Sequence, residues 1–176
     1  MPNSIPTLAS LDMHPYLVDG ALPTGIDGQV GIYAIFDESQ TLQYVGYSRN
    51  ISVGLTQHLV RCPKQCHWFK VHTVTRPSRT LLEEIRTAWL GENGTVPPGN
   101  AEQQMIWEKP IDAKAFMTEA ERDAIANAEP SQTNKLLKQL ARRVEVNVKA
   151  DVEARGAQIP IKFNPKLKEQ GLLALK

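Results

Sequence analysis

The stretch GIYAIFDESQTLQYVGYSRNISVGLTQHL, residues 31–59, decides the fold, because it holds two apolar runs, a polar turn and a helical pattern in succession. The runs at 30–36 and 41–47 are rich in β-branched and aromatic residues, and DESQ between them is typical of a turn. Together they predict an antiparallel β-hairpin. Asn50 then suits the N-cap of a helix from Ile51 to about Val60, whose apolar residues recur every four positions.

Two further segments complete a small unit of mixed structure. The run HWFKVHTVT, residues 67–75, combines aromatic and β-branched residues and predicts a third strand. The run SRTLLEEIRTAWLGENG, residues 78–94, predicts a helix that stops at Gly94. TVPPGN, residues 95–100, predicts an extended loop, because prolines do not continue a helix. The expected fold class is α+β, with a small three-stranded antiparallel sheet flanked by helices.

The chain is expected to fall into three parts. Residues 1–28 contain four prolines and predict an ordered arm with at most a short helix. Residues 29–104 form the sheet domain, and residues 105–176 form a mostly helical extension that packs on it. This division leaves the role of the extension open.

Within the extension, residues 117–129 predict a helix that starts with a capping box of Thr118 and Glu121 and breaks at Pro130. Apolar residues then recur every four positions up to Val152, which favours one long helix ending near Gly156. The alternation in RVEVNVK leaves a strand as the alternative. The tail from residue 159 onward is expected to be an extended segment that packs down.

Composition limits the classes of function. The chain has 20 Lys and Arg residues against 19 Asp and Glu, so it lacks the global basic bias of a protein that coats nucleic acid. Any phosphate binding must therefore come from a local patch. No apolar run approaches the roughly 18 residues of a membrane span, and we see no secretory signal. We expect a globular cytoplasmic protein with no membrane partner, in an oligomeric state that the sequence leaves open.

GIY at 31–33 and YVG at 44–46 place Tyr33 and Tyr44 eleven residues apart on the predicted hairpin. In this strand–turn–strand–helix context, the pair resembles the GIY-YIG nuclease family over about residues 28–100. LQYVGYSRNI and VPPGN look closest to small stand-alone cyanobacterial members and to the N-terminal domain of plant chloroplast monothiol glutaredoxins. The resemblance implies DNA as the partner and phosphodiester cleavage assisted by a divalent cation, Mg²⁺ or Mn²⁺.

The resemblance also implies roles for single residues. Tyr33 and Tyr44 would orient or deprotonate the attacking water, which a phenol with a pKa near ~10 does only beside a cation. A carboxylate on the 78–94 helix would hold the cation, and Glu84 is the expected ligand. Glu83 stays open as an alternative, although it lies opposite the apolar face and suits a capping box with Thr80.

Further alternatives remain for these positions. Registering the 78–94 helix by its tryptophan would put Arg86 at the acid position and leave no metal ligand. Asn100 matches the family's late catalytic asparagine by its order in the chain, and its structural alternative is a bond that terminates the loop. The two tyrosines could simply pack across the hairpin.

The arginine is where the chain departs from the family pattern. The family places an arginine ten residues after the second tyrosine, and here that residue is Gly54. A glycine inside a helix costs roughly 1 kcal/mol relative to alanine. Arg49 is the nearest cation and is expected to contact phosphate or DNA, unless it is a solvated charge. His58 lies one turn beyond Gly54 and is expected to assist phosphate or water, unless it only bonds locally.

Three functions therefore stay open. The first is a metal-dependent endonuclease that binds DNA, with activity altered or weakened at Gly54. The second is a catalytically inactive module of the same fold that binds nucleic acid or protein. The third is a redox-associated partner domain, in which Cys62 and Cys66 could form a disulfide or stay ordinary buried thiols. The chain has no CGFS sequence, and the cysteine spacing argues against zinc. The basic segment at 135–143 is expected to be a solvated helix face or to add phosphate contacts.

Overall fold

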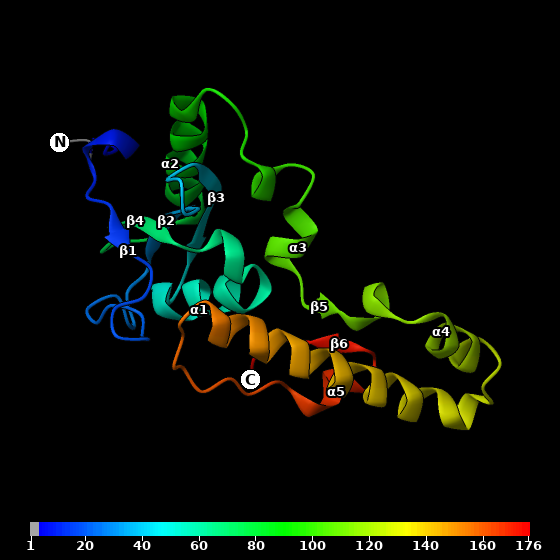
Figure 1. The fold of residues 1–176 in the computed structure, drawn as a ribbon. Helices are drawn as coiled ribbons and strands as arrows, with labels where there is room; N and C mark the ends of the chain where they lie inside the picture. The colour runs from blue at the N-terminus through cyan, green and yellow to red at the C-terminus, as the bar shows by residue number, and fades with distance from the viewer. Residues whose placement is uncertain (1–3) are drawn as a thin grey trace. The chain divides into compact units, whose positions relative to one another are not determined.

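The computed structural model describes residues 4–176, so the first three residues of the predicted arm lie outside the described part. The α+β prediction is confirmed, because an antiparallel sheet with helices is followed by a long C-terminal helix (Figure 1). The chain divides into two compact units, which we call the sheet unit (Met1–Glu108) and the helical unit (Lys109–Lys176). Helix α3 (Gln104–Glu108) belongs to the sheet unit, whereas the expected boundary after residue 104 would separate most of it.

The sheet has four strands in the described residues rather than the predicted three. Their order is β1 (His14–Pro15), β4 (Trp68–Thr73), β2 (Gly31–Phe36) and β3 (Leu42–Ser48), and every pairing is antiparallel. The three predicted strands are all present. The unpredicted strand β1 comes from the arm, whose proline is tolerated because β1 pairs on one side only.

Strand β2 is the central strand, and all six of its residues are buried. Ile32, Ala34 and Phe36 pack with Ile85 and Trp89 of helix α2 (Arg79–Asn93). Side chains alternate along a strand, so Tyr33 points to the other face, toward helix α1 (Ile51–Arg61). Helices α1 and α2 thus cover opposite faces of the sheet (Figure 1).

The ends of the two helices follow local signals. Asn50 caps α1 as predicted, and its side-chain oxygen accepts from the backbone N–H of Ser52 at 3.1 Å. Helix α2 ends at Gly94, which adopts a left-handed φ of 83° that glycine tolerates. The predicted capping box at Thr80 is wrong, because Ser78, two residues earlier, caps α2 and accepts from Leu81 N–H.

The remaining short elements of the sheet unit are three 3₁₀ turns: η1 (Leu8–Ser10), η2 (Pro63–Gln65) and η3 (Pro98–Asn100). The first agrees with the short helix expected in the arm. The third replaces part of the extended loop that we predicted for residues 95–100. The two prolines there are compatible with this turn, because proline is tolerated in the first turn of a helix.

The helical unit is built around helix α5 (Pro130–Ala154). One long helix is thereby confirmed over the strand alternative. Pro130 starts this helix, and the predicted break of the preceding helix at Pro130 is wrong, because that helix already ends at Ala126. The predicted capping box at Thr118 is also confirmed. The other elements of this unit are β5 (Ile111–Asp112), η4 (Ala113–Phe116), α4 (Glu119–Ala126), α6 (Pro165–Lys168) and β6 (Leu172–Leu173).

The tail is more structured than the predicted extended segment. It forms α6 and then β6, and β6 pairs antiparallel with β5. Within residues 4–176, no helix combines the length and the apolar character needed to cross a membrane.

Candidate functional site

Tyr33 and Tyr44 lie beside one another under helix α1, and His58 lies against both. The ring centroids of the two tyrosines are 6.5 Å apart, and the His58 ring is 5.6 Å from Tyr33 and 4.6 Å from Tyr44. The tyrosines come from neighbouring strands, and a bulge between Ile35 and Phe36 shifts the register beside Tyr44. Three of the predicted site residues are therefore brought together.

Hydrogen bonds engage the two phenol groups. The Tyr33 hydroxyl and His58 Nε2 are 2.9 Å apart, and the Tyr44 hydroxyl donates to Glu108 Oε1 at 3.0 Å. Trp107 of α3 stacks on the Tyr44 ring, with centroids 5.2 Å apart. The exposed fractions are only 2% for Tyr33, 5% for Tyr44 and 4% for His58. Helix α3 therefore contributes to a closed cluster that bulk solvent scarcely reaches.

Burial sets the protonation of this cluster. It raises the pKa of both Tyr33 and Tyr44 well above the usual value of a phenol, and the Glu108 carboxylate adds to the effect. Burial lowers the pKa of His58 to about 3, and the nearby charge of Arg61 acts in the same direction. At neutral pH the phenols are protonated and the imidazole is uncharged. Because both phenols are protonated at neutral pH, neither tyrosine can act as a base in this state.

Gly54 owes its identity to the position of Tyr33. A Cβ atom at residue 54 would lie 2.8 Å from the Tyr33 hydroxyl oxygen and 3.1 Å from Cβ of Ser48. A side chain at this position would therefore collide with the phenol in its present place. The site where the family has an arginine is here a packing contact between α1 and the first motif tyrosine.

Three residues of the cluster were missed by the sequence analysis: Arg61, Trp107 and Glu108. Arg61 lies seven residues after Gly54, two turns along the same face of α1, and it interacts electrostatically with both tyrosines and with Glu108. Its Nη1 donates to the backbone oxygen of Trp107 at 2.9 Å. Helical periodicity offered a signal for Arg61, whereas Glu108 joins only through the fold of α3.

The expected acid is not part of the cluster. Glu84 is exposed on α2, whose buried face packs on the sheet side opposite Tyr33. Its neighbour Glu83 accepts from the Tyr47 hydroxyl and from Arg86, each at 2.7 Å. The Tyr47 bond is the main reason why the pKa of Glu83 is lowered, with Arg86 contributing.

The other two predicted site residues also lie apart from the phenols. Arg49 is exposed in the turn between β3 and α1. Asn100 pairs with the backbone of Val45: its Oδ1 accepts from the Val45 N–H and its Nδ2 donates to the Val45 oxygen, both at 2.8 Å. These two hydrogen bonds give Asn100 a structural role, because they hold its loop against strand β3.

The residues present do not fit a divalent cation. Among residues 4–176, no group of three or more His, Cys, Asp and Glu side chains is placed to hold a metal ion. Glu84 lies outside the tyrosine cluster, and the cluster places no second carboxylate beside it. Glu108 is nearer the phenols, but its two oxygens accept from Tyr44 and from Gln104. We therefore derive no chemical step through Mg²⁺ or Mn²⁺.

Cys62 and Cys66 flank η2 as buried thiols that form no disulfide. Burial raises the pKa of Cys62 to about 12. A thiol with so high a pKa is almost entirely protonated at neutral pH, and the thiolate is the reactive form. The arrangement matches the expectation of ordinary buried thiols more closely than that of a reactive pair.

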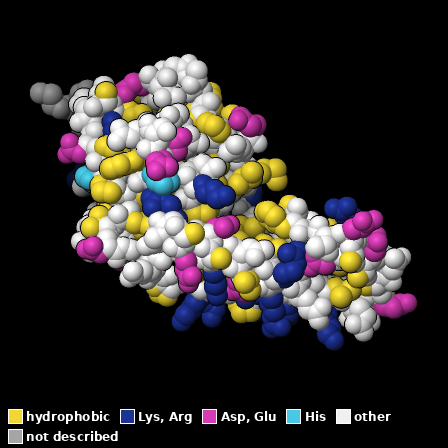
Figure 2. All heavy atoms as spheres, viewed as in Figure 1, with side chains coloured by type: hydrophobic (Ala, Val, Ile, Leu, Met, Phe, Trp, Pro, Cys, Tyr) yellow, Lys and Arg dark blue, Asp and Glu magenta, His cyan; other side chains and the backbone are white. Residues whose placement is uncertain are grey.

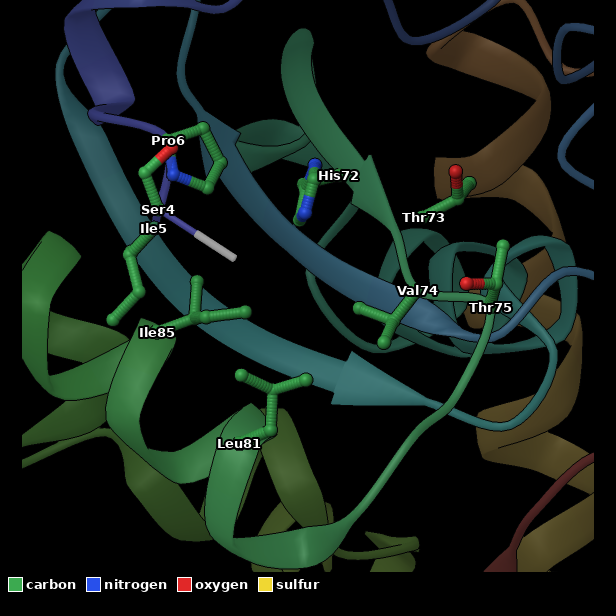
Figure 3. Close-up of a pocket in the computed structure, with 9 residues that line it drawn as sticks. All are labelled: Ser4, Ile5, Pro6, His72, Thr73, Val74, Thr75, Leu81 and Ile85. Atoms are coloured by element: carbon green, nitrogen blue, oxygen red, sulfur yellow. The ribbon is translucent and has the colours of Figure 1, made fainter. Parts of the chain in front are cut away.

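A separate pocket of about 320 Å³ lies on the α2 side of the sheet (Figure 3). Leu81 and Ile85 of α2 and Val74 supply apolar walls, and His72 of β4 is the one ionisable group in its lining. The residues that line it are Ser4, Ile5, Pro6, His72, Thr73, Val74, Thr75, Leu81 and Ile85. It contains none of the predicted site residues.

Comparison with known proteins gives one informative relation. No family model matches the chain. Over 102 residues the chain is 32% identical to the bifunctional monothiol glutaredoxin-S16, chloroplastic, of Arabidopsis thaliana. The match covers 56% of this chain and 33% of that protein, so the chain spans about a third of its relative. This distant homology supports the predicted resemblance to plant chloroplast monothiol glutaredoxins, and it concerns the matched region alone.

Proposed function

We propose that this protein is a nucleic-acid-binding module built on a GIY-YIG-type fold, and that its tyrosine cluster does not hydrolyse phosphodiester bonds. The observation that carries the proposal is that the Tyr33 hydroxyl, held by His58, stands only 2.8 Å from where a Cβ atom at residue 54 would lie. This close approach fills the position where the family's phosphate-stabilising arginine would stand. DNA is the expected ligand, on the strength of the resemblance.

Hydrolysis of a phosphodiester requires an activated water and groups that stabilise the charge of the transition state. In the cluster, the phenols are protonated and buried, so they neither activate water nor reach a phosphate. The exposed carboxylate of Glu84 lies on the other side of the sheet. The guanidinium of Arg61 donates to Trp107. Each requirement is thus unmet in this arrangement.

A metal-dependent endonuclease is the second candidate, and one specific observation favours it. Arg61 and Glu108 bring a cation and a carboxylate next to the two tyrosines, which is the combination of residue types that the chemistry uses. This candidate requires α3 to move away from the phenols, because Trp107 and Glu108 cover Tyr44. Dependence on Mg²⁺ or Mn²⁺ belongs to this candidate.

A plasmid-nicking assay with the full chain decides between the two. Wild-type protein is incubated with supercoiled DNA in Mg²⁺, in Mn²⁺ and in EDTA, next to Tyr33→Phe and Glu108→Gln. We expect no metal-dependent nicking by any of them. Nicking by the wild type that needs the metal and disappears in both variants would establish the endonuclease instead. Glu84→Gln serves as the control for the carboxylate outside the cluster.

Binding to nucleic acid is measured in parallel by fluorescence anisotropy with labelled duplex DNA. We expect binding that weakens steeply with salt, since neutralised phosphates release counterions when a protein binds. Absence of nicking together with absence of binding would overturn the proposed function as a whole.

A further inference from the structure

The two units differ in the sign of their charge. The helical unit contains 13 Lys and Arg residues against 9 Asp and Glu, a net charge of +4. The sheet unit contains 7 against 10, a net charge of −3, and the two values account for the whole chain's +1. Nucleic-acid affinity rests on cations that neutralise phosphates. The helical unit is therefore the better equipped of the two to bind them.

Four basic residues of α5 define a basic stripe: Lys135, Lys138, Arg142 and Lys149. Their offsets of three, seven and fourteen residues place them within about 60° of one another around the helix. The centre of this stripe lies roughly 120° around the helix from the centre of the buried face, which carries Leu140, Ala141, Val144 and Val152. Along the helix axis the stripe extends for about 21 Å.

Three of the four charges of the stripe have no ion-pair partner in the described part of the chain. Lys135 and Arg142 are exposed and Lys138 is half-buried, and none of the three forms an ion pair with a residue in the described part of the chain. Lys149 lies 3.2 Å from Glu145, but Lys168 of α6 also binds this carboxylate, at 2.8 Å. Glu145 is thus opposed by two lysines. Figure 2 shows Lys and Arg side chains gathered along the surface where Figure 1 places α5.

We infer that the basic stripe of α5 is the surface that binds the sugar–phosphate backbone of nucleic acid. This inference rests on the proposed function and assigns its binding to the helical unit rather than to the tyrosine cluster. The charge is complementary, and a length of about 21 Å matches roughly six base pairs at 3.4 Å each. The stripe contacts backbone and reads no base sequence.

The geometry favours nucleic acid over an anionic membrane surface. A helix that lies in a membrane interface buries its apolar face among the lipids and keeps its cations above them. The apolar face of α5 is already buried in the protein through Leu140, Val144 and Val152. The stripe therefore presents mainly positive charge to a partner. Val146 is an exposed apolar side chain near it.

The test compares two triple variants that remove the same charge. The first is Lys135→Gln, Lys138→Gln and Arg142→Gln on the stripe. The control carries Lys64→Gln, Arg76→Gln and Arg79→Gln, three exposed positions of the sheet unit. Both are full chains, and circular dichroism verifies that each is folded. Anisotropy with a labelled duplex and a labelled single strand, titrated at several salt concentrations, separates the two sources of phosphate backbone.

We expect the stripe variant to bind at least one probe more weakly by about ten-fold or more at low salt. Its plot of log affinity against log salt should be shallower by about 2.7 for duplex DNA, since each lost phosphate contact removes about 0.9. The control variant should stay within about two-fold of wild type. Equal losses in the two variants would overturn the stripe and leave the proposed function standing. Wild-type protein that binds neither probe would overturn both.

Discussion

Replacing Gly54 by alanine is expected to destabilise the protein, although alanine is the better helix former. Propensity alone favours Gly54→Ala by about 1 kcal/mol. The new methyl group, however, would lie 2.8 Å from the Tyr33 hydroxyl oxygen, closer than real Cβ atoms approach a neighbour. Overpacking of this kind costs about 1–3 kcal/mol, so the net loss should fall between about zero and 2 kcal/mol.

The same substitution should change sign when the hydroxyl is removed. Tyr33→Phe clears the contact with residue 54, at a cost of about 1–3 kcal/mol because His58 Nε2 loses its buried partner. In that background, Gly54→Ala should stabilise the fold by up to about 1 kcal/mol. The two substitutions should therefore couple by about 1–3 kcal/mol in a double-mutant cycle.

Urea unfolding of the wild type, the two single variants and the double variant measures this coupling. Gly91→Ala is the matched control, because Gly91 also lies within a helix and a Cβ there meets nothing within 4 Å. It should stabilise the protein by about 1 kcal/mol whether residue 33 is tyrosine or phenylalanine. If Gly54→Ala stabilises the wild type as much as Gly91→Ala does, the steric account of Gly54 is refuted.

Three further predictions concern acid, the loop asparagine and the thiols. His58 has a pKa of about 3 when folded and about 6.5 when unfolded. The unfolded chain therefore takes up the proton first, and stability should fall by about 2 kcal/mol between about pH 7.5 and about pH 5. A His58→Gln variant should lose this component. Asn100→Ala should cost about 2–4 kcal/mol in urea unfolding, since it removes two hydrogen bonds and leaves both polar groups of Val45 unpaired. Cys62 and Cys66 should react with a thiol reagent only after unfolding, because both are buried.

Each of these predictions has a control and a contrary outcome. His14 is exposed, so His14→Gln should keep the dependence of stability on acid. An identical pH profile for wild type and His58→Gln would show that His58 is not neutral in the fold. Asn93 donates to an exposed carbonyl, so Asn93→Ala should change stability by about 0.5 kcal/mol or less. Rapid labelling of both thiols in the native protein would restore the redox-associated candidate.

The hairpin, α1, α2 and α5 were predictable because their signals are local. Two apolar runs with a polar turn, a capping Asn50 and a terminal Gly94 each act within a few residues. Strand β1 was not predictable, because His14 and Pro15 carry no strand pattern and owe their pairing to β4. The capping boxes show the same limit. Thr118 is the N-cap of α4, as predicted. At the start of α2, Ser78 is the N-cap, so Thr80 already lies inside the helix and cannot cap it.

The candidate site was predictable in part. The spacing of the motif brought Tyr33 and Tyr44 together, and helical periodicity added His58. Glu84 is separated from them because neighbouring side chains of β2 point to opposite faces of the sheet. The apolar face of α2 packs on the face that does not carry Tyr33. Glu108 belongs to the cluster through its hydrogen bond with Tyr44, which lies 64 residues away in the chain, and no local sequence pattern predicts such a contact.

The two hydrogen bonds between Asn100 and Val45 have a consequence for self-association. Strand β3 is one of the two outer strands of the described sheet, and an outer strand offers its unpaired backbone groups to any other chain that can add a strand. The amide of Asn100 has the same donor and acceptor as a peptide group, so it occupies that position as a neighbouring strand would. The loop after α2 thus blocks strand addition at Val45 on this edge of the sheet.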